Sequence, residues 1–386
     1  MCMCADKYTA VNTHLRASTL CKDGGVKMLR EMYKARGLMP IWPDKTVDWE
    51  TRRKQLIEIL CEEEYGFMPA ECNKVTFEVA SEETNFCAGK ATLRKVIVTA
   101  YFGEKKFSFP IYATIPNKTG KYPFFIHINF RNYVPDRYLP SEELVDRGFA
   151  VISFCYQDVS KDLGRDLDGV SNDVDLHDVL FSDMEKASNH CGRIRLWAWA
   201  ASRAMDYAET LDCLDFSKAA VVGHSRLGKT ALVAGALDER FTCAISNDSG
   251  CSGAAISRGK VGESIEVITR VFPHWFCDNY KKYADNEDTL PFDQHFLIAA
   301  IAPRKAYVAS AVEDTWADPD SEFLACFAAN EVYENLGMKG LVSPDRLPEV
   351  GEAFHEGNIG YHLRSGCHYL GREDWHRFME YMLAQD

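Results

Sequence analysis

The chain has 386 residues, and its 44 Lys and Arg against 57 Asp and Glu give a formal net charge of −13. Hydrophobic residues make up 46% and charged residues 26%, proportions typical of a soluble globular protein rather than of a disordered or collagen-like chain. An acidic chain without a basic run lacks the electrostatic footprint of a nucleic-acid-binding protein, and anionic membrane surfaces would repel it. We therefore expect neither nucleic acid nor a membrane as partner, and we expect a monomer.

The cysteines, 14 in number from Cys2 to Cys367, form no CxxC pair. Zinc sites need Cys and His in closely spaced pairs, so no metal site is predicted. The first residues, MCMCADKYTAVNTHLRA, lack the basic start and the apolar stretch of about 7–15 residues that mark a secretion signal. Many cysteines without an export signal favour a cytoplasmic protein, and a secreted one only if the true start lies upstream.

Residues 1–70 are expected to form a helical extension packed on a single catalytic domain of residues 71–386. Asp48 is placed to cap a helix that starts at Trp49 and carries apolar residues at helical spacing. Between Val75 and Ile115 the apolar residues instead alternate with polar ones, which predicts antiparallel strands.

Beyond Pro123, compact apolar runs predict strands that are buried on both faces, separated by helical patterns, the first of which has Ser141 as its cap. Residues 157–190 form a long polar stretch, typical of a lid or a substrate wall. The alternation of strands and helices predicts an α/β protein, a three-layer sandwich whose mostly parallel sheet has helices on both faces.

The segment 223–228, GHSRLG, joins a β-branched strand to an alanine-rich helix. A serine at such a bend projects its hydroxyl from the carboxyl edge of the sheet, beside the N–H groups of the first helical turn. Ser225 is therefore the predicted nucleophile, although Leu227 stands where the usual G-x-S-x-G motif has its second glycine. The alternative interpretation is a serine that only caps the helix.

A nucleophilic serine needs a base, and the base needs an orienting acid. Asp314 comes directly after a predicted strand and is a candidate acid, and His368, in the loop after the last strand, is the preferred base. The competing histidines are His355, in a loop, and His362, inside the strand itself. Asp248 is a second candidate acid at the same edge of the sheet, and its alternative role is to form a local turn.

Five segments carry a family resemblance: GHSRLGK, ALDERF, NDSGCSGAAISR, VEDTWADP and HLRSGCHYL. They are similar to the glucuronoyl esterases of carbohydrate esterase family fifteen, more to the bacterial branch than to the fungal one, from about Tyr122 to the C-terminus. The resemblance implies the α/β-hydrolase fold, a carboxylic ester hydrolase, a carbohydrate ester as substrate, and neither cofactor nor metal.

The resemblance also implies roles for individual residues. Arg226, directly after the nucleophile, would support the oxyanion, and Asp248 occupies a position where the family usually has glutamate. Aspartate is one methylene shorter, and which of Asp248 and Asp314 orients His368 stays open. The family's uronate-contacting positions correspond here to Lys229, Glu263 and Trp316.

These residue types suit a sugar independently of the resemblance. Lys229 and Glu263 make a donor–acceptor pair for vicinal hydroxyls, and Trp316 offers a flat apolar face to a sugar ring. The alternatives are a solvated lysine, a glutamate on a surface helix and a tryptophan in the core. The sequence thus favours a Ser-His-Asp esterase acting on (4-O-methyl-)glucuronoyl esters of xylan or lignin–carbohydrate type. Two alternative interpretations remain. The chain would be an acetylesterase for acetylated xylo-oligosaccharides, or an inactive carbohydrate-binding relative.

Overall fold

A computed structural model describes residues 28–165, 170 and 172–384 of the chain, and its centre is a ten-stranded sheet. The strands are β1 (Lys74–Asn85), β2 (Ala91–Phe102), β3 (Lys105–Pro116), β4 (Tyr122–Asn129), β5 (Ala150–Cys155), β6 (Leu214–His224), β7 (Cys243–Asn247), β8 (Lys305–Ala311), β9 (Ala353–Phe354) and β10 (Ile359–Arg364). Their order across the sheet is β1-β2-β3-β5-β4-β6-β7-β8-β10-β9.

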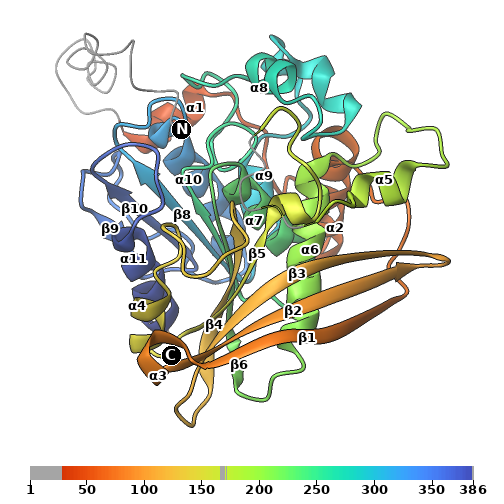
Figure 1. Ribbon diagram of the computed structural model, residues 1–386. Coiled ribbons are helices and arrows are strands. Elements are labelled where there is room, and N and C mark those ends of the chain that lie inside the picture. The colour runs from red at the N-terminus through yellow and green to blue at the C-terminus, as the bar shows by residue number, and fades with distance from the viewer. Residues whose placement is uncertain (1–27, 166–169, 171, 385–386) are drawn as a thin grey trace, which may run out of the picture.

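The middle of this sheet is parallel and its edges are antiparallel. β5, β4, β6, β7, β8 and β10 run parallel to one another, whereas β3 pairs antiparallel with β5 and β9 pairs antiparallel with β10. β1, β2 and β3 pair antiparallel, as the alternation between Val75 and Ile115 predicts, and extend to one side of the molecule (Figure 1). The predicted mostly parallel sheet is confirmed.

Helices and helical turns connect the strands. They are α1 (Leu29–Ala35), α2 (Trp49–Leu60), η2 (Cys61–Tyr65), α3 (Phe86–Gly89), α4 (Ser141–Asp146), η3 (Tyr156–Asp158), α5 (Leu176–Phe181), α6 (Arg193–Ala208), α7 (Arg226–Leu237), α8 (Ile265–Val271), η4 (Asp278–Tyr283), η5 (Glu287–Thr289), α9 (His295–Ala299), α10 (Pro319–Asn335) and α11 (Arg372–Leu383). None of the helices described is long and apolar enough to cross a bilayer.

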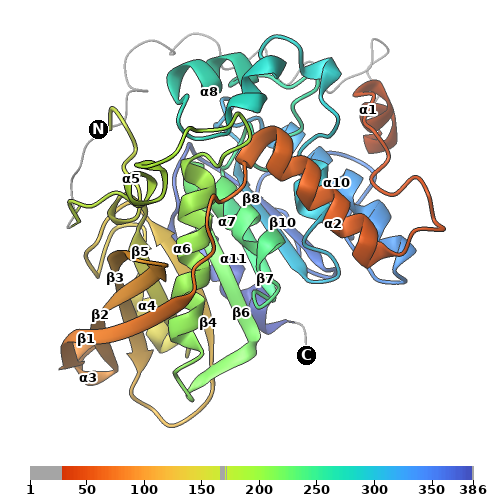
Figure 2. The ribbon, with the colours of Figure 1, turned by 90° about the vertical axis from the view of Figure 1, so that its right-hand side faces the viewer.

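The two faces of the sheet are covered by different helices, which gives two apolar cores. Phe125 and Val222 point to the core under α4 and α11, whereas their neighbours Phe124 and Val221 point to the core under α6 and α7. Figure 2 shows α6 and α7 in front of the sheet and α11 behind it. Strands covered on both sides need apolar residues on both faces, which explains their uninterrupted apolar runs.

The N-terminal part of the described chain packs on the same core. Asp48 caps α2 as predicted, its carboxylate accepting the N–H of Thr51 at 2.9 Å, and Leu56 and Leu60 of this helix are buried in the main core. The first 27 residues of the predicted extension lie outside the described residues, and its boundary at residue 70 stays a prediction.

The predicted cap at Ser141 is wrong. Pro140 occupies the N-cap position of α4, so Ser141 is already the first helical residue and stands one place too late for a cap. Its hydroxyl is buried and has no hydrogen-bond partner among the residues that the structure describes.

The parallel register brings four loops to one edge of the sheet. His224 of β6 pairs with Asn247 of β7, and Asn247 pairs with Ala309 of β8. β10 runs beside β8 in the same direction, so all four strands end at the same edge. The loops after β6, β7, β8 and β10 carry Ser225, Asp248, Asp314 and His368, respectively.

Candidate active site

Ser225 occupies a sharp turn between β6 and α7. Its φ of 59° and ψ of −127° are unusual for a residue other than glycine, and such strain collects at functional sites. Its hydroxyl makes no capping bond to α7, so the interpretation of Ser225 as a simple helix cap is wrong. Gly223 makes the turn possible, because a Cβ there would lie 2.0 Å from the carbonyl oxygen of Leu227.

The second glycine of this turn serves a different contact. A Cβ on Gly228 would come within 3.1 Å of the Asn247 carbonyl oxygen and of the Ser246 hydroxyl. The start of α7 therefore packs closely on the end of β7. Leu227, which replaces the glycine of the usual motif, is fully buried.

His368 lies beside this turn and bonds to Asp314. Its Nδ1 is 2.6 Å from Oδ2 of Asp314, and its ring centroid is 4.4 Å from that of His224, the residue before Ser225. The Asp314 side chain is almost buried, whereas that of His368 is 41% exposed. An Nδ1–H bonded to a carboxylate leaves Nε2 as the basic nitrogen of the ring.

Asp248, the second candidate acid, bonds elsewhere. Its carboxylate accepts hydrogen bonds from the N–H groups of Ala311 at 2.8 Å and Tyr369 at 3.3 Å, and from Nη2 of Arg364 at 3.0 Å. Burial raises the pKa of Asp248 well above its ordinary value, and the positive charge of Arg364 opposes that rise. These long-range partners replace the local turn that was the alternative for Asp248.

Arg364 holds the loop that carries His368. Its Nη1 donates to the carbonyl of Cys367 at 3.1 Å and its Nη2 to the carbonyl of Tyr369, so one guanidinium binds the backbone on both sides of His368. Its Nε donates to Asp374 at 2.9 Å. A buried arginine with two carboxylate partners and several carbonyl acceptors is a rigid support.

Asp248, Asp314 and His368 place one possible ligand atom each within 4.8 Å of one another. Within the described parts of the chain, this is the group whose geometry could hold a metal ion. Nη2 of Arg364 already bonds Asp248, and Nδ1 of His368 already bonds Asp314, so an ion would have to displace both contacts.

The two competing histidines lie away from the turn. His362 is buried in β10, where Nδ1 contacts the Tyr307 hydroxyl at 3.0 Å and Nε2 contacts Asp374 at 2.9 Å. Nε2 of His355 contacts the same Tyr307 hydroxyl at 2.8 Å. His362 thus belongs to the buried interior, as expected for a histidine within a strand, and the partly buried His355 adjoins it through Tyr307.

Arg226 is held by a buried carboxylate, that of Asp162. Asp162 Oδ2 contacts Nη1 of Arg226 and the Tyr156 hydroxyl, while Oδ1 is 2.8 Å from Nε2 of His274 and 2.7 Å from Nε1 of Trp275. Burial alone would raise the pKa of Asp162, but the bond from His274 and the charge of Arg226 lower it to about 2. The Asp162 carboxylate is therefore ionised at neutral pH.

Aromatic rings enclose the Arg226 guanidinium. Its central carbon lies 4.9 Å from the ring centroid of Trp275 and 5.7 Å from those of Phe130 and Phe272. Its Nε is buried without a partner among the described residues. The N–H groups of Gly228 and Lys229 already donate to the Ser225 carbonyl, which leaves the first-turn N–H groups of Arg226 and Leu227 for an anion that forms at Ser225.

Lys229 is buried rather than solvated. Its Nζ donates to the carbonyls of Ser249 and Cys251, each at 2.5 Å, and lies 3.9 Å from Oε2 of Glu263. Burial lowers the pKa of Lys229, and the neighbouring Glu263 opposes that shift. Two of its three donors are occupied, which leaves one on the side of Glu263.

Glu263 and Trp316 come from two adjoining loops. The N–H of Glu263 donates to the Trp316 carbonyl at 3.1 Å, and a Cβ on Gly262 would lie 2.4 Å from the same carbonyl oxygen. Glu263 precedes α8 and is not on a surface helix, and Trp316 is 55% exposed and not in the core. The Glu263 carboxylate thus stands beside the buried ammonium of Lys229, and the backbone of the exposed Trp316 adjoins that of Glu263.

Comparisons with known proteins identify the family of the chain. A protein-family model described as glucuronyl esterase, fungi, matches residues 98–337. The chain belongs to the glucuronoyl esterase family. Its resemblance to that family, stated above from sequence motifs, is confirmed.

Two curated relatives of this glucuronoyl esterase family member match it over part of their length. A carbohydrate esterase of an unknown prokaryotic organism is 43% identical over 240 residues, which are 62% of this chain and 54% of that protein. The 4-O-methyl-glucuronoyl methylesterase of Podospora anserina is 28% identical over 301 residues, which are 75% of this chain and 57% of that protein. The chain thus spans little more than half the length of these two curated relatives.

Solved structures of the glucuronoyl esterase family match nearly the whole chain. A glucuronoyl esterase from Solibacter usitatus is 32% identical with a TM-score of 0.77, and the match covers 95% of this chain and 96% of that one. The α/β-hydrolase fold predicted for the chain is thereby confirmed.

In this family member, three residues that contact the predicted site residues were not identified from the sequence. Asp162 lay in the polar stretch 157–190, which carries no recognisable motif. Arg364 stands close to His368 in HLRSGCHYL, where an arginine inside an apolar strand was the available signal. His224, directly before Ser225, packs against His368, and its Nδ1 contacts Asn247 at 2.6 Å. Burial and the nearby His368 hold the pKa of His224 well below its ordinary value.

Proposed function

We propose that this chain is a serine carboxylic ester hydrolase that cleaves (4-O-methyl-)glucuronoyl esters of xylan or lignin–carbohydrate type. The observation that carries the proposal is a His368–Asp314 pair beside the strained turn of Ser225, with the buried Lys229 next to Glu263 close by. Membership of the glucuronoyl esterase family supports it, as does the similarity to the 4-O-methyl-glucuronoyl methylesterase of Podospora anserina.

The reaction starts at the serine hydroxyl. Nε2 of His368 takes the proton of Ser225 Oγ while that oxygen attacks the ester carbonyl on C6 of the uronate. Asp314 keeps the proton of His368 on Nδ1 and stabilises the imidazolium that forms. The resulting oxyanion accepts hydrogen bonds from first-turn N–H groups of α7 and from the Arg226 side chain.

The acyl-enzyme forms and breaks by the same groups. His368 gives its proton to the leaving alcohol, the C–O bond to that alcohol breaks, and the uronoyl group stays on Ser225. Water then enters, His368 removes its proton, and attack on the acyl carbon releases the uronic acid and restores the serine.

Recognition of the sugar rests on Lys229, Glu263 and Trp316. The remaining Nζ donor of Lys229 and the Glu263 carboxylate are spaced to contact neighbouring hydroxyls, and the exposed Trp316 face packs on the ring. An acetyl group offers neither hydroxyls nor a ring to these residues.

The substrate test follows from that difference. Because a buried polar site discriminates strongly against ligands that leave it unpaired, we expect kcat/KM on benzyl glucuronate to exceed that on acetylated xylo-oligosaccharides by about 100-fold or more. Equal or higher kcat/KM on the acetylated substrate would favour the acetylesterase. An enzyme that cleaves neither and is not labelled by a serine-directed fluorophosphonate would be an inactive relative.

A second prediction concerns the pair of Arg226 and Asp162. Loss of one oxyanion donor costs about 10²- to 10³-fold in kcat, so Arg226→Ala should lower kcat in that range with little change in KM. Asp162→Asn should lower kcat by a smaller factor, because it acts only by holding Arg226.

The double variant distinguishes these roles. If Asp162 acts through Arg226, adding Asp162→Asn to Arg226→Ala should leave kcat unchanged, whereas independent effects would multiply. The exposed Arg270 serves as the matched control, and Arg270→Ala should retain full activity. Multiplying effects in the double variant would contradict the proposed role of Asp162.

A further inference from the structure

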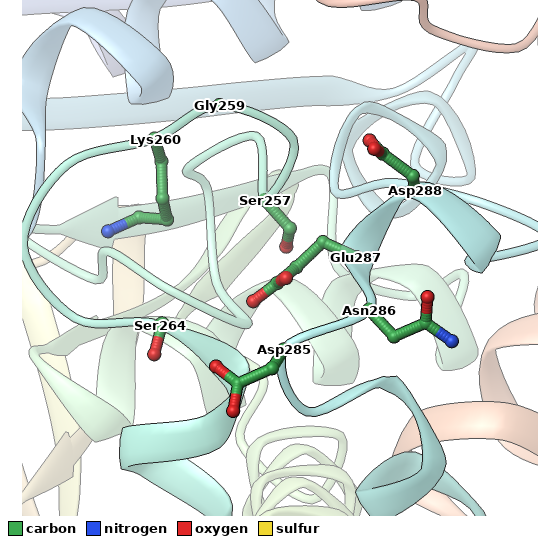
Figure 3. A pocket seen from close by; sticks show the side chains of 8 residues that line it. All are labelled: Ser257, Gly259, Lys260, Ser264, Asp285, Asn286, Glu287 and Asp288. Atoms are coloured by element: carbon green, nitrogen blue, oxygen red, sulfur yellow. The ribbon is translucent and has the colours of Figure 1, made fainter.

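A cavity of about 300 Å³ lies beside the loop that carries Glu263, between residues 257–264 and residues 285–288 (Figure 3). Ser264, which directly follows Glu263, lines the cavity. Lys260 lines it too, and its Nζ donates to the Glu263 carbonyl at 2.7 Å. The wall of the cavity and the uronate-facing residue Glu263 are thus parts of one loop.

Both walls of this cavity are fixed to the same buried ion pair. Asp293 is fully buried and accepts the N–H of Ser257 at 2.7 Å. Its partner Arg258 donates to the carbonyls of Leu290 at 2.7 Å and Asp288 at 3.4 Å, on the opposite wall. The cavity is therefore a built feature of the fold and not a gap between independent loops.

One polar group in the cavity wall lacks a partner. Ser257 is 4% exposed, and its hydroxyl is buried without a hydrogen bond to any described residue. Figure 3 shows this hydroxyl facing the same space as the carboxylates of Glu287 and Asp285. Buried hydroxyls in native proteins nearly always have a partner, and a polar group of a ligand in this cavity would supply the one that Ser257 lacks.

The lining selects the chemistry of that ligand. Hydroxyl, carboxylate and ammonium groups in one small cavity match the donors and acceptors of a sugar. Asp285, Glu287 and Asp288 outnumber Lys260, so a second uronate would be repelled. A cation fits poorly, because these carboxylates do not form a group with converging ligand atoms, as Asp248, Asp314 and His368 do within the described residues.

We propose that this cavity binds one neutral sugar unit of the oligosaccharide whose uronoyl ester enters the Ser225 site. The volume, at the lower end of the roughly 300–1,000 Å³ of small-ligand pockets, suits a single sugar ring. The inference rests on the proposed function, since it assigns a second contact to the same substrate. With this second contact, the enzyme binds the glycan around the ester as well as the uronate.

Steady-state kinetics on two esters test the inference. The probes are benzyl glucuronate, which ends at the uronate, and the benzyl ester of a glucuronoyl-substituted xylotriose. In Ser257→Ala and Glu287→Gln we expect KM for the oligosaccharide ester to rise roughly three- to tenfold, the effect of one lost hydrogen bond, with kcat unchanged. Both constants on benzyl glucuronate should stay at the wild-type values.

Controls separate binding from folding. The Ser257 hydroxyl makes no bond within the described protein, so Ser257→Ala should keep the wild-type melting temperature. Glu78→Gln, on the exposed face of β1, is the matched control for Glu287→Gln and should leave all constants unchanged. Equal KM on the oligosaccharide ester in wild type and both cavity variants would overturn the inference.

Failure of the proposed esterase function can be distinguished from failure of the cavity to bind a sugar. If wild type hydrolysed neither ester, calorimetric titration with unesterified xylotriose would still test the cavity, and loss of that binding in Ser257→Ala would support it. A melting temperature that rises with calcium in wild type but not in Glu287→Gln would identify a cation as occupant and overturn the sugar.

Discussion

Ser225→Ala is expected to lower kcat on benzyl glucuronate by about 10⁶-fold, the loss seen when a serine hydrolase loses its nucleophile, with KM changed by less than about twofold. Alanine cannot form the acyl-enzyme, whereas the sugar contacts of Lys229, Glu263 and Trp316 remain. Initial rates at saturating ester, with enough enzyme to detect the residual activity, measure the effect.

The loss of activity in Ser225→Ala should not be accompanied by a loss of stability. The Ser225 hydroxyl makes no capping bond, so its removal takes no hydrogen bond from α7. The melting temperature of Ser225→Ala should therefore match that of wild type. Ser217→Ala, at an exposed position of β6, is the control and should keep full activity. A Ser225→Ala enzyme that retained more than about 1% of kcat would contradict the covalent mechanism.

Local sequence pattern was sufficient to predict the frame of the site. The β-branched strand before Gly223 and the alanine-rich helix after it place Ser225 at a strand–helix junction. Asp314 and His368 follow predicted strands, and because parallel strands end at one edge, the three residues were expected to lie together. The structure places His368 against both Asp314 and the residue before Ser225.

Long-range partners could not be predicted in the same way. Asp162 and Arg226 are 64 positions apart, and Asp248 and Arg364 are 116 apart, so no periodicity relates them. Their pairing depends on how loops fold over the sheet edge, and hydrophobic spacing carries no information on that. The different roles of Asp248 and Asp314 depend on such a partner as well. Arg364 bonds the carboxylate of Asp248, whereas His368 bonds that of Asp314.

Because Asp314 is the carboxylate that bonds His368, its replacement should strongly lower kcat. Asp314→Asn is expected to lower kcat by about 10⁴-fold, as the equivalent change does in other serine hydrolases. The amide of asparagine would donate to Nδ1 of His368 and shift the ring proton to Nε2, where it blocks removal of the serine proton. KM for benzyl glucuronate should stay within about twofold, since neither Lys229 nor Glu263 is touched.

Asp248→Asn should behave differently, because Asp248 supports the His368 loop through Arg364 and does not itself contact the imidazole. An amide at this position puts a donor against the Arg364 guanidinium, so we expect the free energy of unfolding to fall by about 1–3 kcal/mol, measured by urea denaturation. The loss in kcat should stay within about tenfold. The exposed Asp212→Asn should change neither quantity. A larger kcat loss in Asp248→Asn than in Asp314→Asn would reverse the assignment and make the residue after β7 the acid that orients the base.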